Sequence, residues 1–313
     1  MKRTVLVLTV ATMALGALAA ARAQEGPAIP DEAALAKDPK LFLKLARTLL
    51  KWDEAAEPTK ILGPLYFVGT KGLAVYLITT AQGHILIHTG MPGSGPLIAA
   101  SIRKLGFRPE DIKLLLVGHA HIDHVGDHAY IQKLSGAQVA ASNLEVELTE
   151  SGGKTDFHYG TAGDFTFEPV KVGRVLHDGD VLKIGDVALT ALVTPGHTQG
   201  STTYIANLVD GGRVYTVVFP NGTSINPGYR VAKDPSYPGI ADDYRRTFHV
   251  LEMIKADVWL DGHNDVYDLE GKRARAAREG VAAWVDPAGY RKWLRGVRDK
   301  FEAKIDAETG AVR

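Results

Sequence analysis

The chain contains no cysteine among its 313 residues. This absence excludes disulfide bonds, a thiolate nucleophile and any metal site with a cysteine ligand. The chain also lacks an excess of charge, since 36 basic residues balance 36 acidic ones and no block of Lys or Arg occurs. A balanced surface gives no reason to expect a nucleic acid as a partner. The fold must therefore rely on a hydrophobic core, which a chain of this length can supply.

The N-terminus has the three parts of a secretory signal peptide. Met1-Lys2-Arg3 is positively charged, Val5 to Ala20 is apolar, and Ala21-Arg22-Ala23 is an A-x-A cleavage site. An apolar run of about 16 residues that ends in small residues is too short for a membrane anchor. We expect residues 1–23 to be removed on export, which predicts a periplasmic protein without stable membrane insertion.

The remaining residues, 24–313, are predicted to form one α/β domain with a helical N-terminal extension over Asp31 to Trp52, interrupted near Pro39. Short apolar runs predict strands over residues 65–68, 73–79, 85–88, 112–117, 138–141, 181–184, 187–194, 202–207, 214–219 and 258–260. Helices are predicted over residues 96–105, 126–134, 143–149, 240–255, 271–279 and 287–307. Asn143 is the predicted cap of the third of these. Ser151 to His177 lacks a clear period, which predicts a long surface loop.

Three imidazoles and one carboxylate lie within the segment His119-Ala120-His121-Ile122-Asp123-His124, directly after the predicted strand 112–117. Neutral imidazole combined with carboxylate is a donor set that suits zinc. In an extended segment His119 and His121 point to the same side and can bind one ion. Asp123 and His124 come after the chain turns and can reach a second ion nearby. Solvated loop histidines are the alternative, but random placement rarely yields H-x-H-x-D-H behind a strand.

Two further histidines follow predicted strands. Thr194-Pro195-Gly196-His197-Thr198 comes after the strand 187–194, and Gly262-His263 comes after the strand 258–260. A glycine precedes each histidine, which lets the backbone bend close to an ion. Either histidine alone could be structural, but together with the motif they supply the additional ligands that a zinc pair needs.

These motifs together resemble the metallo-β-lactamase superfamily over about Leu65 to Tyr267. The resemblance implies an α/β fold, an αβ/βα sandwich of two mixed β-sheets flanked by helices, with two zinc ions at one edge of the sheets. It also implies the ligands of each ion. The first zinc would be held by His119, His121 and His197, and the second by Asp123, His124 and His263.

The absence of cysteine narrows the resemblance, because two β-lactamase subclasses need a cysteine ligand. Glyoxalase II-like and lactonase-like members usually carry a bridging aspartate after the strand that follows T-P-G-H-T, whereas Phe219 to Ser224 contain no carboxylate. Asn226 to Arg230, Tyr237-Pro238 and Asp242 to Phe248 resemble segments of subclass B3. The resemblance therefore implies that a zinc-bound hydroxide hydrolyses the β-lactam ring amide and confers antibiotic resistance.

The same resemblance assigns roles to residues beside the ligands. Asp123 would orient the nucleophile as well as bind metal, and Tyr229 would assist the oxyanion unless it is a packing residue. Thr223 and Ser224 would contact the substrate carboxylate, although turn chemistry after Gly222 is an equal alternative.

His88 stands where members commonly have an acidic residue that orients a zinc-bound imidazole. Because a neutral ring raises ligand basicity less than an anion does, His88 predicts weaker retention of zinc. Two other functions stay open from the sequence: an exported lactonase or other zinc hydrolase of the same fold, and a non-catalytic zinc-binding relative. Nothing in the sequence predicts the oligomeric state.

Overall fold

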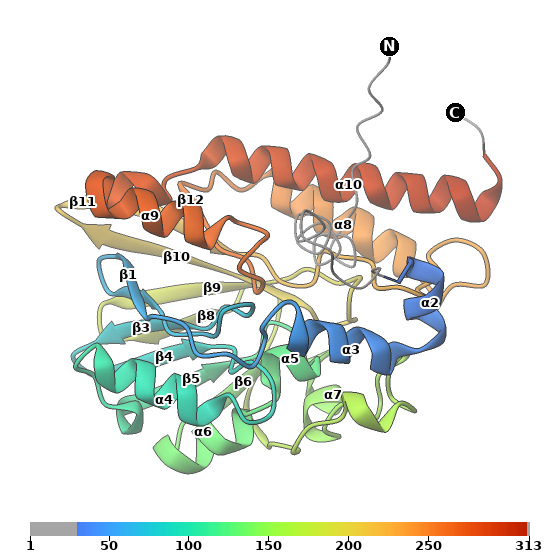
Figure 1. The fold of residues 1–313 in the computed structure, drawn as a ribbon. Coiled ribbons are helices and arrows are strands. Elements are labelled where there is room, and N and C mark those ends of the chain that lie inside the picture. The colour runs from blue at the N-terminus through green and yellow to red at the C-terminus, as the bar shows by residue number, and fades with distance from the viewer. Residues whose placement is uncertain (1–29, 312–313) are drawn as a thin grey trace.

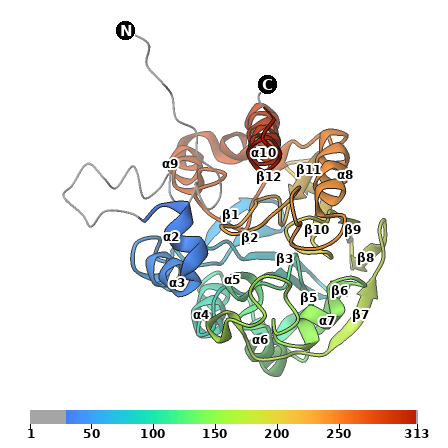
Figure 2. The ribbon, with the colours of Figure 1, turned by 90° about the vertical axis from the view of Figure 1, so that its right-hand side faces the viewer.

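Short apolar segments rich in branched residues form the strands of two β-sheets, which lie face to face at the centre of the molecule (Figures 1 and 2). Helices cover the outer face of each sheet. This computed structural model describes residues 30–311, so the predicted signal peptide lies outside the described residues. The predicted fold class, an αβ/βα sandwich with two mixed sheets, is confirmed.

The first sheet has seven strands, which follow one another across the sheet in chain order. They are β1 (Thr59–Leu62), β2 (Leu65–Phe67), β3 (Tyr76–Thr80), β4 (Gly83–Ile87), β5 (Ile112–Leu116), β6 (Gln138–Ser142) and β7 (Val172–Leu176). Strands β1 to β4 pair antiparallel, whereas β4 to β7 pair in parallel. Strands β4, β5 and β6 of the parallel part are mostly buried, which agrees with their nearly continuous apolar runs.

The second sheet has five strands in the order β12-β11-β10-β9-β8. They are β8 (Val181–Ile184), β9 (Val187–Val193), β10 (Thr202–Asp210), β11 (Arg213–Phe219) and β12 (Val258–Trp259). Strands β8 to β11 form an antiparallel meander, and β12 adds to β11 in parallel. The carboxyl ends of β9 and β12 therefore come to the same region as the carboxyl end of β5 in the first sheet.

The outer layers are helical. The first sheet is covered by α4 (Gly95–Lys104), α6 (His128–Ser135) and α7 (Val146–Glu150), with the short α5 (Ile122–Val125) beside the sheet edge. The second sheet is covered by α8 (Ile240–Glu252), α9 (Leu269–Glu279) and α10 (Pro287–Thr309). Short 3-10 helices are η2 (Pro109–Asp111), η3 (Gly163–Phe165) and η4 (Gly280–Trp284). Within residues 30–311, none of these helices combines the length and the apolar character needed to cross a membrane.

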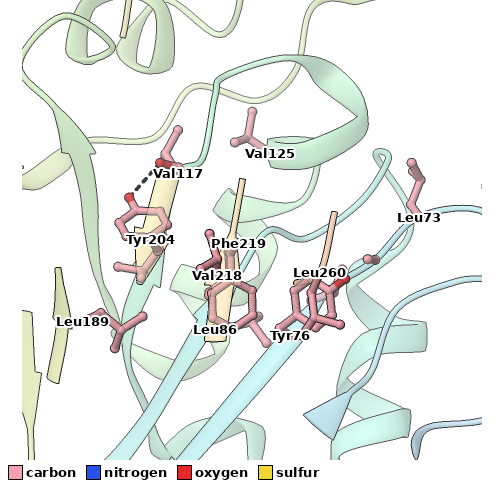
Figure 3. Close-up of a cluster of buried hydrophobic side chains, with 14 of the residues drawn as sticks. Leu73, Tyr76, Leu86, Val117, Val125, Leu189, Tyr204, Val218, Phe219 and Leu260 are labelled. Atoms are coloured by element: carbon pink, nitrogen blue, oxygen red, sulfur yellow. Dashed lines mark hydrogen bonds between the residues drawn. The ribbon is translucent and has the colours of Figure 1, made fainter. Parts of the chain in front are cut away.

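The core lies between the two sheets (Figure 3). Tyr76 and Leu86 from the first sheet meet Leu189, Val218 and Phe219 from the second, and each is 0–1% exposed. Burying a large apolar side chain of this kind contributes roughly 1.5–3 kcal/mol relative to leaving it exposed. This packing holds together the two edges from which the functional side chains project.

Hydrogen bonds also join the sheets next to the histidine motif. The Tyr204 hydroxyl of β10 donates to the carbonyl oxygen of Val117 at 2.8 Å (Figure 3). The Thr202 amide donates to the carbonyl oxygen of Gly118 at 2.7 Å. Both bonds are buried, so the start of the motif loop has a fixed position relative to the second sheet.

The N-terminal extension consists of α2 (Glu32–Lys37) and α3 (Pro39–Thr48). Helix α3 lies beside α5, which belongs to the histidine motif (Figures 1 and 2). Asp31 caps α2 by accepting a hydrogen bond from the Ala34 amide. Pro39 occupies the first position of α3, where its missing N–H costs nothing. The predicted break near Pro39 is thus the start of a second helix.

Two sequence predictions about the segment after β6 are wrong. Helix α7 begins at Val146, not at residue 143, because the Asn143 amide still pairs with the carbonyl oxygen of Leu176 on β7. The predicted surface loop from Ser151 to His177 contains the edge strand β7 and buries Tyr159 and Phe165. Tyr159 and Phe165 lie in irregular segments, so the sequence around them shows no helical or strand periodicity that would predict their burial.

Candidate metal centre

Six side chains gather at the shared edge of the two sheets in two groups of three. His119, His121 and His197 form the first cluster, and Asp123, His124 and His263 form the second. In each cluster one potential ligand atom from every residue lies within 4.8 Å of the others. The clusters are adjacent, since the rings of His119 and His124 have centroids 4.2 Å apart. The structure therefore groups these residues into the two triads that the resemblance implied.

The local conformation of the motif places its residues in different clusters. His121 has an extended backbone, with φ −89° and ψ 154°, so it shares one side with His119. Helix α5 begins at the next residue and turns the chain, which directs Asp123 and His124 to the second cluster. This is the geometry expected from an extended segment followed by a turn.

The glycines before the other two histidines are required where they stand. Gly196 has a φ of +136°, a conformation that L side chains rarely adopt. A Cβ at Gly262 would lie 2.7 Å from Cε1 of His124, closer than real carbon contacts. Both positions therefore need glycine for His197 and His263 to reach the clusters.

In the first cluster, hydrogen bonds select the nitrogen that two of the three rings leave free. His197 places Nδ1 2.8 Å from the carbonyl oxygen of Ser224, so its Nε2 is left for the cluster. His121 places Nε2 3.2 Å from Oδ2 of Asp156, which leaves its Nδ1. A histidine whose other nitrogen is bonded in this way has a fixed tautomer and orientation, as metal-binding histidines usually do.

Asp156 is a functional residue that the sequence analysis missed. It lies in the segment predicted to be a surface loop, yet its side chain is 2% exposed. The amides of His158 and Tyr159 donate to its Oδ1, and the contact with His121 and these amides lower its pKa to about 2 despite burial, which acts in the opposite direction. Asp156 is 35 residues from its histidine partner, so no local spacing could have revealed the pair.

In the second cluster a carboxylate lies between two imidazoles. Oδ2 of Asp123 is 3.1 Å from Nε2 of His124 and 3.2 Å from Nε2 of His263. Burial would lower the pKa of His263, but its contacts with Asp123 and Asp261 outweigh that and raise the pKa to about 10. The three groups thus meet around one point where positive charge is favourable, which a divalent cation can supply in place of the proton.

The donor set fits metal ions. Both ring nitrogens of His119 and Nδ1 of His124 are buried and have no hydrogen-bond partner within residues 30–311. Burial, followed by the neighbouring histidines, holds the pKa of His119 well below its usual range, so this ring is neutral and can act as a ligand. Buried polar atoms without partners are rare, and a bound cation would satisfy them. The two clusters could therefore hold metal ions.

His88 packs beside the clusters and belongs to neither of them. Its ring centroid is 4.7 Å from that of His124 and 6.4 Å from that of His119. Burial lowers the pKa of His88 well below its usual range, with His124 and His128 adding to the effect, so the ring is neutral. Neither of its nitrogens has a hydrogen-bond partner among the described residues. His88 thus supplies no negative charge to the metal ligands.

A pocket opens over the clusters and has an apolar mouth. Phe42 and Leu43 of α3 line it together with Trp52, Tyr159 and Phe165. Trp52 lies against the metal-ligand candidate His263, with ring centroids 5.4 Å apart. The N-terminal extension and the segment after α7 therefore both form walls of the site.

Thr223 and Ser224 line a cavity on the other side of the clusters, together with His119, His197 and His263. The predicted contact of these two residues with a substrate carboxylate stays a prediction. Ser224 also accepts a hydrogen bond at its carbonyl oxygen from Tyr244 at 2.7 Å, which fixes the loop.

Tyr229 is buried against the loop that carries His197. The residue is 0% exposed, and its hydroxyl donates to the carbonyl oxygen of His197 at 3.0 Å. These contacts agree with the packing alternative, in which Tyr229 supports the loop that carries His197. Its role with the oxyanion stays a prediction.

The αβ/βα sandwich and the paired clusters at its edge define a metal-dependent hydrolase class. A family model described as the metallo-beta-lactamase superfamily matches residues 70–207. The chain belongs to the metallo-β-lactamase superfamily, and its solved relatives include a subclass B3 enzyme.

Two solved structures are similar over almost their whole length. The FEZ-1 metallo-β-lactamase from Legionella gormanii is 37% identical, with a TM-score of 0.80, over 82% of this chain and 98% of that one. BJP-1, a subclass B3 metallo-β-lactamase of Bradyrhizobium japonicum, is 36% identical, with a TM-score of 0.79, over 86% of this chain and 100% of that one.

Curated relatives point to a wider range of hydrolases. A probable metallo-hydrolase of Burkholderia pseudomallei is 31% identical over 51% of this chain, which spans about half (52%) of that relative's length. A hydroxyacylglutathione hydrolase of a Bradyrhizobium species is 26% identical over 65% of this chain and 74% of its own length.

Proposed function

We propose that this protein is an exported, periplasmic β-lactamase that binds two zinc ions per chain and hydrolyses the ring amide of β-lactam antibiotics, thereby conferring resistance. The observation that carries the proposal is the pair of adjacent clusters, each with three donors, four of which line one pocket. Three imidazoles in one cluster and two imidazoles with a carboxylate in the other are donor sets that suit zinc.

The chemistry divides between the metal and the chain. Zinc, when bound, polarises carbonyl groups as a Lewis acid and makes water acidic near neutral pH. The ligand histidines would hold it, and the apolar mouth formed by Trp52, Tyr159 and Phe165 would limit the access of bulk water. Thr223 and Ser224, which line the cavity beside the clusters, are the residues we propose to donate hydrogen bonds to the carboxylate of a β-lactam.

Asp123 is the residue we propose to handle the proton. Its contacts with His124 and His263 both use Oδ2, so Oδ1 can accept a hydrogen bond from an attacking water. As water oxygen bonds to the amide carbon, Oδ1 can accept the proton and pass it to the amide nitrogen when the C–N bond breaks. This sequence needs no serine nucleophile and no acyl-enzyme.

The loop after β11 favours a β-lactamase over a hydroxyacylglutathione hydrolase. Asn221 stands where a bridging aspartate is usual in the latter group, and its amide donates to the carbonyl oxygens of Thr202 and Phe219 at 2.9 and 3.0 Å. An amide committed to the strand ends does not serve as an anionic bridge. The likeness to FEZ-1 and BJP-1 along their full lengths supports the same choice.

The test is turnover of three substrate classes by the zinc-loaded protein, with zinc content per chain measured on the same sample. A chromogenic cephalosporin should be hydrolysed, and activity should disappear with a chelator and return with zinc. An acyl-homoserine lactone and a hydroxyacylglutathione thioester should be poor substrates. Hydrolysis of the lactone or the thioester without the cephalosporin would favour the alternative hydrolase. Two bound zinc ions without any turnover would identify a non-catalytic zinc-binding relative.

A further inference from the structure

Glu145 is a buried carboxylate that lies outside both clusters. Glu145 immediately precedes α7 and is only 1% exposed. Its backbone is fixed on both sides, because its amide donates to the carbonyl oxygen of Ser142 at 2.9 Å and its carbonyl accepts from Thr149. The side chain therefore leaves a rigid point at the end of the first sheet.

Three hydrogen-bond donors from two different loops converge on this carboxylate. The Ala120 amide donates to Oε1 at 2.6 Å. The Thr198 hydroxyl donates to Oε2 at 2.9 Å, and the Gly200 amide donates to the same oxygen at 3.0 Å. Burial raises the pKa of Glu145 to about 7, while the bonds from Ala120 and Thr198 favour the ionised form and oppose that rise.

The two loops joined in this way are the loops that carry the first cluster. Ala120 lies between His119 and His121 in the motif, and Thr198 directly follows His197. The motif loop extends from the first sheet and the Thr198 loop from the second. The Glu145 side chain thus joins the loop of the histidine pair directly to the loop of the third histidine. The second cluster has no corresponding contact with the carboxylate.

A carboxyl group satisfies this arrangement, whereas a side-chain amide does not. Each of the two oxygens accepts from a backbone amide, and a backbone amide cannot reverse its role. Glutamine at this position would turn its NH2 group toward either the Ala120 or the Gly200 amide, whichever way its own amide is oriented. A buried N–H facing another donor is unsatisfied, and the two loops would move apart to relieve the conflict.

We propose that Glu145 is a positioning residue for the first metal ion, which it serves by holding the loops of His119, His121 and His197 in register. The residue does not touch the ion or a substrate. This inference rests on the proposal that the first cluster binds zinc, and it is independent of which substrate is hydrolysed. Losing an interaction that orients metal ligands typically weakens metal binding by about 10–100-fold.

The experiment measures the zinc dissociation constant of each cluster separately. A His263→Ala background leaves the first cluster as the complete one, and a His197→Ala background leaves the second. Competition with a chromophoric chelator should show that Glu145→Gln weakens zinc binding at least about tenfold in the first background and leaves it unchanged in the second. The d–d absorption of Co²⁺ in the His263→Ala background should change in the same variant.

Glu308 offers a matched control, because it is another carboxylate that holds a loop through three amides. The amides of Val231, Ala232 and Lys233 all donate to its Oε2, so glutamine can keep all three bonds by placing its own oxygen there. Glu308→Gln should leave the zinc affinity of both backgrounds unchanged.

Circular dichroism of the metal-free variants checks folding. If Glu145→Gln does not fold, Glu145→Asp keeps an acceptor-only group that is too short to span both loops, and it should weaken the first cluster in the same way. Unchanged affinity in the His263→Ala background would overturn the proposal, and so would an equal loss in both backgrounds. If the parent backgrounds themselves bind no zinc, it is the proposed function that fails.

Discussion

Replacing His88 by aspartate should strengthen zinc binding by this protein. His88 directly follows β4 and has a φ of +69°, a left-handed conformation that asparagine, aspartate and histidine adopt more readily than other L residues. The exchange therefore requires no change of the backbone. It replaces a neutral ring by an anion beside two candidate metal ligands.

The expected gain in zinc affinity depends on which nitrogen of His124 the new aspartate carboxylate can reach. Nε2 of His124 faces Asp123, so Nδ1 is the nitrogen without a function in the cluster. This Nδ1 atom and Cε1 of His88 both lie beside Gly262, since a Cβ on that glycine would be 3.1 Å from the first and 3.4 Å from the second. A carboxylate that accepts from a ligand imidazole typically improves metal affinity by about 10–100-fold. This corresponds to about 1.4–2.8 kcal/mol of binding free energy.

The assay is a zinc titration against a chromophoric chelator, with turnover of a cephalosporin measured at limiting zinc. His88→Asn is the control, since it has the shape of the aspartate without its charge and should give no gain. Without metal, the carboxylate that His88→Asp buries should lower the melting temperature, so the difference between zinc-loaded and metal-free protein should widen. Unchanged zinc affinity and turnover in His88→Asp, or an equal gain in His88→Asn, would refute the reasoning.

Three further outcomes are expected. Asp156→Asn should weaken zinc binding by about 10–100-fold, because an NH2 group facing Nε2 of His121 favours the tautomer whose Nδ1 carries the proton; equal zinc affinity in variant and parent would contradict this. Adding a chelator should lower the melting temperature of the protein by about 5–10 °C relative to zinc at about 100 times its dissociation constant, because the ligands join both sheets, and a calorimetric scan without a shift would exclude such a link. Lys300→Met should raise the melting temperature at pH 7. Burial lowers the pKa of Lys300 to about 8 from 10.5, so its charge opposes folding below pH 8 and this penalty disappears as the pH rises through 10.5. The gain from Lys300→Met should therefore shrink at pH 10, and a gain that is independent of pH would refute this assignment.

The candidate ligands were predictable because their signals are local. The spacing of His119, His121, Asp123 and His124 indicates a metal site from a single loop. The remaining two histidines each follow a strand and a glycine. The strands were predictable for the same reason, since each is a short apolar run between turn residues. Local patterns were therefore enough to predict the fold class and two groups of donors that the structure brings together.

The supporting residues were not predictable, because their partners are distant in the chain. Asp156 is 35 residues from His121, and Glu145 is 25 residues from Ala120 and 55 from Gly200. A single carboxylate in a polar segment looks like a solvated side chain until the tertiary structure buries it. Tyr229 shows a related difficulty: it is fully buried, and its place in a loop gives no sequence signal that separates packing from a role with the oxyanion.

The ligands are drawn from strand ends that are far apart in the sequence, and this sets an order of assembly. The first cluster is complete once His197 has joined the motif, whereas the second needs β12, the last strand of the second sheet, to bring His263 into place. A chain that folds from its N-terminus as it emerges thus acquires its two binding sites one after the other. A protein truncated before β12 would keep the three donors of the all-histidine cluster and lose one donor of the other.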